Sequence, residues 1–237
     1  MGKIEDEAAT VVRELVKGRE RTVPAHARSA LAWLLALQWQ RSRFLMYVTG
    51  KASGVEGSGL SDEEVQTSMM GFISMYVIDP WRLRDDDAYY KDQWNHLVST
   101  LLSSDVRWSC YRPRKGGLLV GDNPVCFSGV VGPPPEDVPP GYFDHGVGVG
   151  FQNFRRLTLP LGSTLAVIIS RDPQDHSRLR VADISRYSVF NSREFVAHAP
   201  DWAKSHPDLA RELPHLLEQQ RMVAPAFLQG YAPGERN

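Results

Sequence analysis

The chain has 237 residues, of which 42% are apolar and 23% charged, a balance that is typical of globular proteins and excludes disordered and fibrous classes. The net charge is −1, so we expect no large nucleic-acid footprint and no anionic membrane as partner. No apolar run approaches the roughly 20 residues of a membrane span, and no apolar leader is seen, so we expect a soluble, cytoplasmic protein. Cys110 and Cys126 are too few for a disulfide framework and are predicted to be inert core thiols.

The first hundred residues have the apolar spacing of helices. In the first of them, apolar positions recur every three or four residues, and acids precede bases, as the helix dipole favours. The third begins with a capping box, Ser61 to Glu64. The predicted helices cover residues 4–17, 24–48, 61–80 and 85–102. The buried face of the fourth is predicted to comprise Tyr90, Trp94, Leu97, Val98, Leu101 and Leu102.

After residue 105 the pattern changes to short apolar segments bounded by Gly, Pro and Asn, which is typical of strands. They cover residues 106–111, 117–120, 125–128, 157–159 and 165–170. Residues 129–150 hold six glycines and five prolines, so we expect a long surface loop there. Two further helices are predicted, over 183–198 and 207–220.

This order of elements predicts an α+β fold, because helices and strands are segregated rather than alternating. We expect an N-terminal helical bundle packed on a small, mainly antiparallel sheet, with C-terminal helices after it. The whole chain, 1–237, is predicted to be a single domain. Its parts are a mainly helical segment (1–105), a strand-rich segment with the Gly/Pro loop (106–182) and the C-terminal helices (183–237).

A polar turn, Gly121-Asp122-Asn123-Pro124, separates two of the apolar strand segments. The residue types alone favour a structural turn, in which Asp and Asn side chains satisfy nearby backbone groups and Pro fixes the geometry. The functional interpretation is that Asp122 is held rigidly at a strand end as a general base or metal ligand. A single carboxylate does not make a metal site, so this interpretation needs partners from elsewhere in the chain.

A basic stretch precedes this turn in the sequence. Residues 21–55 contain no acid and five Lys or Arg residues, a local charge of +5. Within it, Gln38 and Arg41 are three positions apart on the second predicted helix and share a face. An arginine beside an amide can hold a phosphate or carboxylate through paired hydrogen bonds. Equally, Arg41 can pair internally with an acid, such as Asp122 or one of the aspartates at 85–87.

Four motifs in this order resemble the DUF4238 family of uncharacterised microbial proteins. They are Leu-Ala-Leu-Gln38-Trp-Gln-Arg41-Ser, Gly121-Asp122-Asn123-Pro124-Val125, Leu159-Pro160-Leu161, and residues 184–196 with Asn191. The resemblance covers roughly residues 5–200. Two features depart from it: Gly121 stands where the family has Ser, and the family's His-His-Tyr-Val-Pro-type opening motif has no counterpart. The resemblance marks Gln38, Arg41, Asp122, Asn123, Pro124 and Asn191, and it implies no particular reaction.

Two functional hypotheses follow. In the first, the protein is a metal-assisted phosphoester or nucleic-acid hydrolase, with Asp122 and Asn123 as the catalytic pair. Arg41, Gln38 and Asn191 would then bind a small anionic or phosphate-containing substrate, and Asp122 would be the ligand of any metal, with Mg²⁺ as the candidate. The alternative is a non-catalytic binding or regulatory module that uses its aromatic residues at an interface, including one between copies of itself. A structural interpretation also stands, in which Asp122 and Arg41 form a buried ion pair.

Overall fold

The computed structural model describes residues 3–40, 88–114, 117–133, 149–172, 178–192 and 195–230. Of Gln40, 88–93 and 221–230 only the helical backbone is described. Arg41, the predicted helix over 61–80 and most of the Gly/Pro loop lie outside these ranges. The helices are α1 (Lys3–Lys17), α2 (Ala25–Gln40), α6 (Ala88–Leu102), α8 (Val181–Asn191), α9 (Trp202–Ser205) and α10 (Pro207–Gly230). The strands are β1 (Arg107–Tyr111), β2 (Val120–Gly121), β3 (Cys126–Val130), β4 (Phe154–Pro160), β5 (Ala166–Ser170) and β6 (Val196–Ala197).

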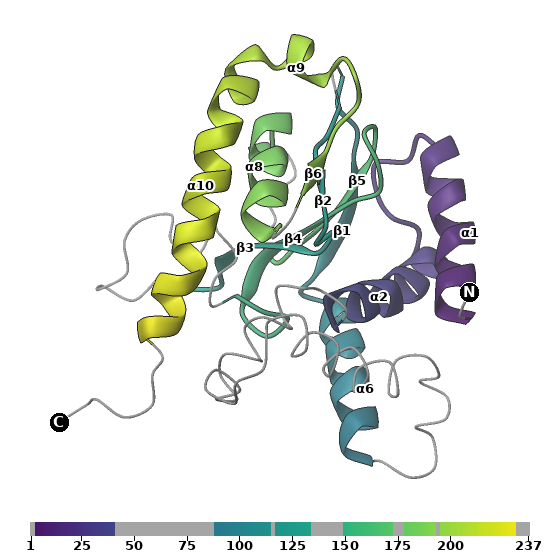
Figure 1. Cartoon of the computed structure of the whole chain (residues 1–237). Helices are drawn as coiled ribbons and strands as arrows, with labels where there is room; N and C mark the ends of the chain where they lie inside the picture. Colours follow the sequence, from purple (N-terminus) through teal and green to yellow (C-terminus); the bar gives the residue numbers. More distant parts are fainter. Residues whose placement is uncertain are drawn as a thin grey trace, which may run out of the picture.

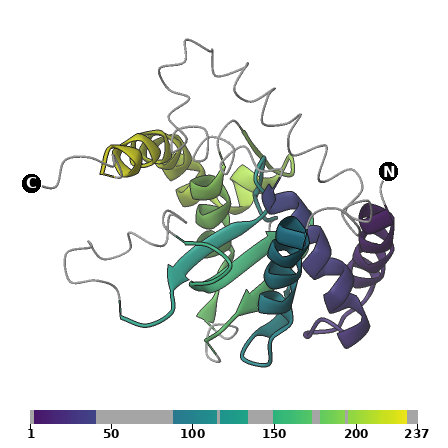
Figure 2. The same ribbon diagram turned by 90° about the horizontal axis from the view of Figure 1, so that it is seen from below.

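Four strands form an antiparallel sheet in the order β1-β5-β4-β3. Helices lie on both of its faces, with α1, α2 and α6 on one side and α8 on the other, and α10 packs on the outside of α8 (Figures 1 and 2). The predicted α+β class, with N-terminal helices on a mainly antiparallel sheet and helices after it, is therefore confirmed.

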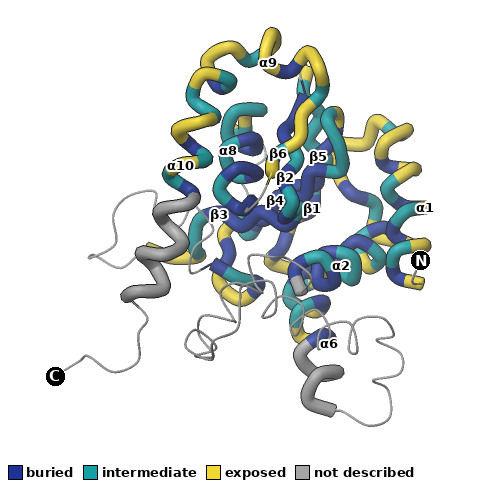
Figure 3. The backbone as a smooth tube through the Cα atoms, viewed as in Figure 1, coloured by how far each residue is buried: buried dark blue, intermediate teal, exposed yellow. Residues whose placement is uncertain are grey.

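The two-sided covering explains the sequence of β5. Alternate residues of a strand point to opposite faces, and every residue from Ala166 to Ser170 is buried. Val167 and Ile169 join the core under the N-terminal helices, whereas Ala166 and Ile168 pack with Ile184 of α8. Figure 3 shows the buried residues gathered in the sheet and on the helix faces that meet it. An uninterrupted apolar strand thus reflects helices on both faces.

Strands β2 and β6 form a separate two-stranded ladder beside α8, with Gly121 opposite Val196. This corrects two sequence predictions. The strand expected over 117–120 contributes only Val120 to a ladder, and that ladder lies outside the main sheet. The helix expected over 183–198 ends at Asn191, since Ser192 is extended (φ −90°, ψ 153°) and Val196 and Ala197 pair with β2.

Two further predictions need smaller corrections. Leu102, predicted to be buried, is 42% exposed because it is the last residue of α6, where the chain turns away from the core. The last helix runs ten residues past the predicted end at Gln220, to Gly230.

Candidate functional site

Three of the segments singled out in the sequence meet at Phe127 of β3. Its ring packs edge-on against Trp39 in the last turn of α2, with centroids 4.7 Å apart and ring planes at 87°. Its backbone is held by the side chain of Asn191, the last residue of α8. Gln38, directly before Trp39, is half-buried. The end of α2, the strand after the polar turn and the end of α8 therefore converge, although Arg41 lies outside the described residues.

The turn itself has the structure that its residue types favour. The side-chain oxygen Oδ1 of Asn123 accepts a hydrogen bond of 3.2 Å from the backbone N–H of Val125, two residues on. The backbone N–H of Asp122 donates to the carbonyl of Phe195 at 3.2 Å, which ties the turn to the segment leading into β6. The predicted structural role of the turn is therefore present, and it fixes the positions of both predicted catalytic residues.

The side-chain nitrogen of Asn123, Nδ2, has no hydrogen-bond partner among the described residues. Because Oδ1 is identified by its bond from Val125, the other atom is the amide nitrogen Nδ2, a donor of two hydrogen bonds. Asn123 is 1% exposed, and Nδ2 is buried without any acceptor. A buried donor left unpaired costs about 1–3 kcal/mol, so native structures keep few of them, and each requires an explanation. Because Nδ2 has almost no accessible surface, a ligand oxygen could reach it only if the turn opened around it.

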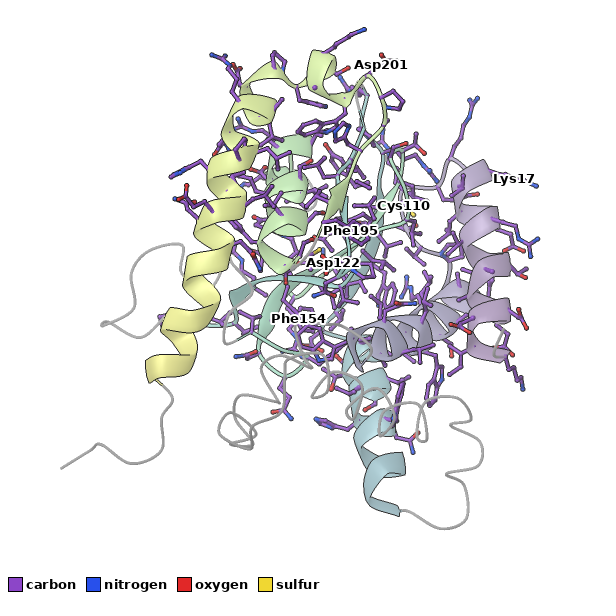
Figure 4. All side chains as sticks on the ribbon, in the orientation of Figure 1. Lys17, Cys110, Asp122, Phe154, Phe195 and Asp201 are labelled. Atoms are coloured by element: carbon purple, nitrogen blue, oxygen red, sulfur yellow. The ribbon has the colours of Figure 1, made fainter. Side chains whose placement is uncertain are left out.

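Asp122 is half-exposed, so its carboxylate is accessible from the surface while its backbone is fixed. Figure 4 shows Asp122 at the end of α8 that lies nearest β3, beside Phe195. Within the part of the chain that the structure describes, no three His, Cys, Asp or Glu side chains are placed to hold a metal ion together. The described residues therefore supply no complete set of metal ligands at Asp122.

The thiol of Cys126 lies buried beneath the turn. Cys126 is fully buried in β3, and this burial raises its pKa to about 12, with the nearby charge of Asp122 adding to the rise. Cys110 is a half-buried free thiol in β1. Three strand spacings separate β1 from β3, about 14 Å, which is too far for a disulfide between these cysteines. Both cysteines lie in strands, as the sequence predicts.

Asn191, predicted to bind substrate, is committed to the protein's own backbone. Its Nδ2 donates to the carbonyls of Phe127 (3.2 Å) and Tyr187 (2.9 Å), and its Oδ1 accepts from the N–H of Phe127 (3.1 Å). Both amide hydrogens are therefore used within the fold, and we assign no ligand to this residue.

The absence of a side chain at Gly121 has a steric reason. A Cβ on Gly121 would lie 1.7 Å from the Oγ of Ser192 and 3.0 Å from the carbonyl oxygen of Ser188. Strand β2 thus approaches the end of α8 more closely than a side chain permits. No sequence pattern indicated Ser188 and Ser192. The signal of a close approach was the glycine directly after the predicted strand over 117–120.

Comparison of the chain with family models, with curated proteins and with solved structures finds no match. The resemblance to DUF4238 stays a prediction. None of the described helices combines the length and the apolar character that crossing a membrane requires.

Proposed function

We propose that the Gly121–Pro124 turn binds the phosphate group of a small ligand, and that the protein hydrolyses phosphoesters at this site. The observation that carries the proposal is the unpaired, buried Nδ2 of Asn123, in the residue next to an accessible carboxylate. A phosphate oxygen is a strong acceptor and would pair this donor if the turn opened around it.

The negative charges of the phosphate and of the Asp122 carboxylate mean that the proposed site also needs a cation. A phosphate beside the carboxylate of Asp122 is repelled unless a cation lies between them. Mg²⁺ suits this position, because it keeps several waters and is commonly bound through one or two carboxylates together with substrate phosphates. Such an ion stabilises charge on the phosphoryl oxygens and lowers the pKa of bound water. In this arrangement Asp122 holds the cation, Asn123 orients the phosphate, and Arg41 is the candidate for a second positive group.

The test is turnover of p-nitrophenyl phosphate and bis(p-nitrophenyl) phosphate with Mg²⁺ present. Asp122→Asn keeps the shape and removes the charge of a half-exposed residue, so we expect kcat/KM to fall about 100-fold or more, with an unchanged melting temperature. Asp201→Asn is the matched control, because Asp201 is an exposed residue in the turn before α9, far from Asp122 in Figure 4.

A second variant isolates the amide. Asn123→Asp retains an oxygen for the N–H of Val125, replaces the unpaired donor with a second oxygen and places a carboxyl group in the buried position. We expect weaker binding of inorganic phosphate, measured by calorimetry with Mg²⁺ present. Phosphate binding without turnover would favour the alternative of a binding module. If the unmodified protein neither binds phosphate nor hydrolyses either ester, the proposal is contradicted.

A further inference from the structure

We infer that the C-terminal part of the protein opens from the main sheet as one unit, and that this movement opens the Gly121–Pro124 turn. The unit comprises β2, α8, β6, α9 and α10, and its three helices lie together beside the sheet in Figure 1. The opening itself follows from packing. That it admits a ligand to the turn rests on the proposed function.

Helix α8 meets the main sheet with little apolar surface. Its buried residues are Ile184, Ser185, Ser188, Val189 and Asn191, and three of these are polar. Val189 packs in the cluster shared with α9 and α10, so Ile184 is the one buried apolar residue of α8 that packs with β5. Hydrogen bonds, such as those of Asn191 to β3, make up much of the remaining contact, and water can replace them when the unit moves. The boundary is therefore weak.

Buried hydroxyl groups weaken this boundary further. Thr158 of β4 lies opposite Ile168, which packs with Ile184, so its side chain is on the α8 face of the sheet. Its Oγ1 and the Oγ of Ser185 on α8 are buried and have no hydrogen-bond partner among the described residues. An unpaired buried polar group is costly, and exposure to water removes that cost. The closed state alone bears the penalty, which favours opening.

Apolar packing on each side of the boundary survives separation. The opposite face of the sheet carries the larger core, which includes Trp39 and Trp108 together with aliphatic residues of α1, α2 and α6. The C-terminal unit has a cluster of its own, in which Trp202 and Leu216 pack with Val189. Proteins open locally in cooperative units of this kind, where few buried apolar contacts cross between them.

The turn lies across this boundary. Before the turn, Leu119 packs in the cluster of the unit, and its carbonyl accepts a hydrogen bond of 3.0 Å from the Oγ of Ser188. After the turn, Phe127 belongs to β3 of the main sheet and to the core on its other face. The unit can move only when Asn191 releases the backbone of Phe127. Such movement separates the two ends of the turn, which is the change that access to its buried amide nitrogen requires.

Hydrogen exchange followed residue by residue by NMR, in urea below the unfolding midpoint, measures the opening. The reporters are the amides of Phe127, bonded by Asn191, and of Val125, bonded within the turn. We expect both to exchange about 10-fold or more faster than the amides of β5, which exchange through global unfolding. If they exchange only as fast as those of β5, the inference is overturned.

Two variants separate the opening from global unfolding. Val11→Ala on α1 weakens a core that stays packed in the open state, so it should speed exchange in β5 and leave Phe127 and Val125 unchanged. Thr158→Val keeps the shape and removes an unpaired hydroxyl from the boundary, so it should slow exchange of Phe127 and Val125 about 5-fold or more. Equal acceleration of all amides by Val11→Ala would overturn the inference.

Inorganic phosphate with Mg²⁺ tests access to the turn. A ligand that binds only the open state increases its population, so a half-saturating concentration for that state should speed exchange of Phe127 and Val125 about twofold. Phosphate that binds and slows their exchange would overturn access through opening, while the phosphate site would stand. If phosphate does not bind, the proposed function is overturned, and the exchange in the free protein still decides whether the unit opens.

Discussion

Asn191 pairs its side-chain amide with the backbone of Phe127 in the way that a neighbouring strand would. One amide hydrogen donates to the Phe127 carbonyl and the amide oxygen accepts from the Phe127 N–H, at 3.2 and 3.1 Å. Because β3 is an edge strand of the sheet, these backbone groups would otherwise be unpaired. Helix α8 thus covers the sheet and also closes its edge with its last residue.

Replacing Asn191 with Ala should lower the free energy of unfolding by about 2–4 kcal/mol, because it leaves a buried N–H and a buried carbonyl of Phe127 unpaired. Urea denaturation measures the loss. Asn95→Ala is the matched control, since Asn95 is exposed on α6, and it should change stability by less than about 0.5 kcal/mol. A loss below that value for Asn191→Ala would contradict the edge-closing role.

Gly121→Ala should destabilise the protein by about 1–3 kcal/mol, because the added Cβ meets Ser192 and the backbone of Ser188. Gly121→Ala should cost less stability in a Ser192→Gly background than in the unmodified protein, because the added Cβ then no longer meets the Ser192 side chain. Gly150→Ala serves as control, because a Cβ there meets nothing within 4 Å. Additive losses in the double variant would show that the two residues do not compete for space. Thermal and urea unfolding are both suitable.

Cys126 should make stability depend on pH in the alkaline range. Burial raises its pKa from the ordinary 9.0 to about 12, so above pH 9 the unfolded chain releases a proton that the native protein keeps. The unfolded state then binds fewer protons, and the free energy of unfolding falls with rising pH, by at most about 1.4 kcal/mol per unit between pH 9 and 12. Below pH 9 this contribution is constant.

The measurement is urea denaturation at several pH values from 8 to 10.5 for the unmodified protein and for Cys126→Ala. The difference in stability between the two should shrink as the pH rises. A pH-independent difference would show that Cys126 ionises equally well in the native state. In the same range, a thiol reagent should modify Cys126 only after unfolding, because the side chain is fully buried.

Trp39→Ala should cost about 3–5 kcal/mol, because a large ring buried against Phe127 and Phe151 is lost and a cavity remains. The experiment matters for the site, since Trp39 is the contact that places the end of α2, and with it Gln38, beside β3. Trp39→Phe, which keeps an aromatic ring, should lose less. A cost below 1 kcal/mol for Trp39→Ala would mean that the end of α2 is not seated on the sheet.

Local sequence was sufficient for much of the fold. The apolar spacing of α1 predicted its four buried positions, Ile4, Ala8, Val11 and Leu15, because a helix periodicity shows directly in one segment. The polar turn was predicted for the same reason, since an Asn side chain satisfies a backbone group only two residues away. The α+β class followed from the order of such segments.

The candidate site was predicted in part. The sequence indicated the end of α2 and the turn as polar interruptions of apolar segments, and the resemblance to DUF4238 marked Asn191 at the end of α8. These segments meet at Phe127. The sequence did not indicate what each polar residue does there. Asn191 has the residue type of a substrate ligand, yet its hydrogen bonds go to a strand that is 64 positions away in the sequence. No pattern within one segment contains that partner.

The sequence by itself determined the local elements and the self-contained turn, because their hydrogen bonds and buried faces involve neighbours along the chain. Only the tertiary structure decided where α8 ends, since Phe195 and Val196 continue its apolar spacing but pair with β2 instead. It also decided that the Phe195 ring remains exposed opposite Asp122, and that Asn123 keeps an unpaired donor. These features depend on which distant segments meet, and that choice is made by packing over the whole chain.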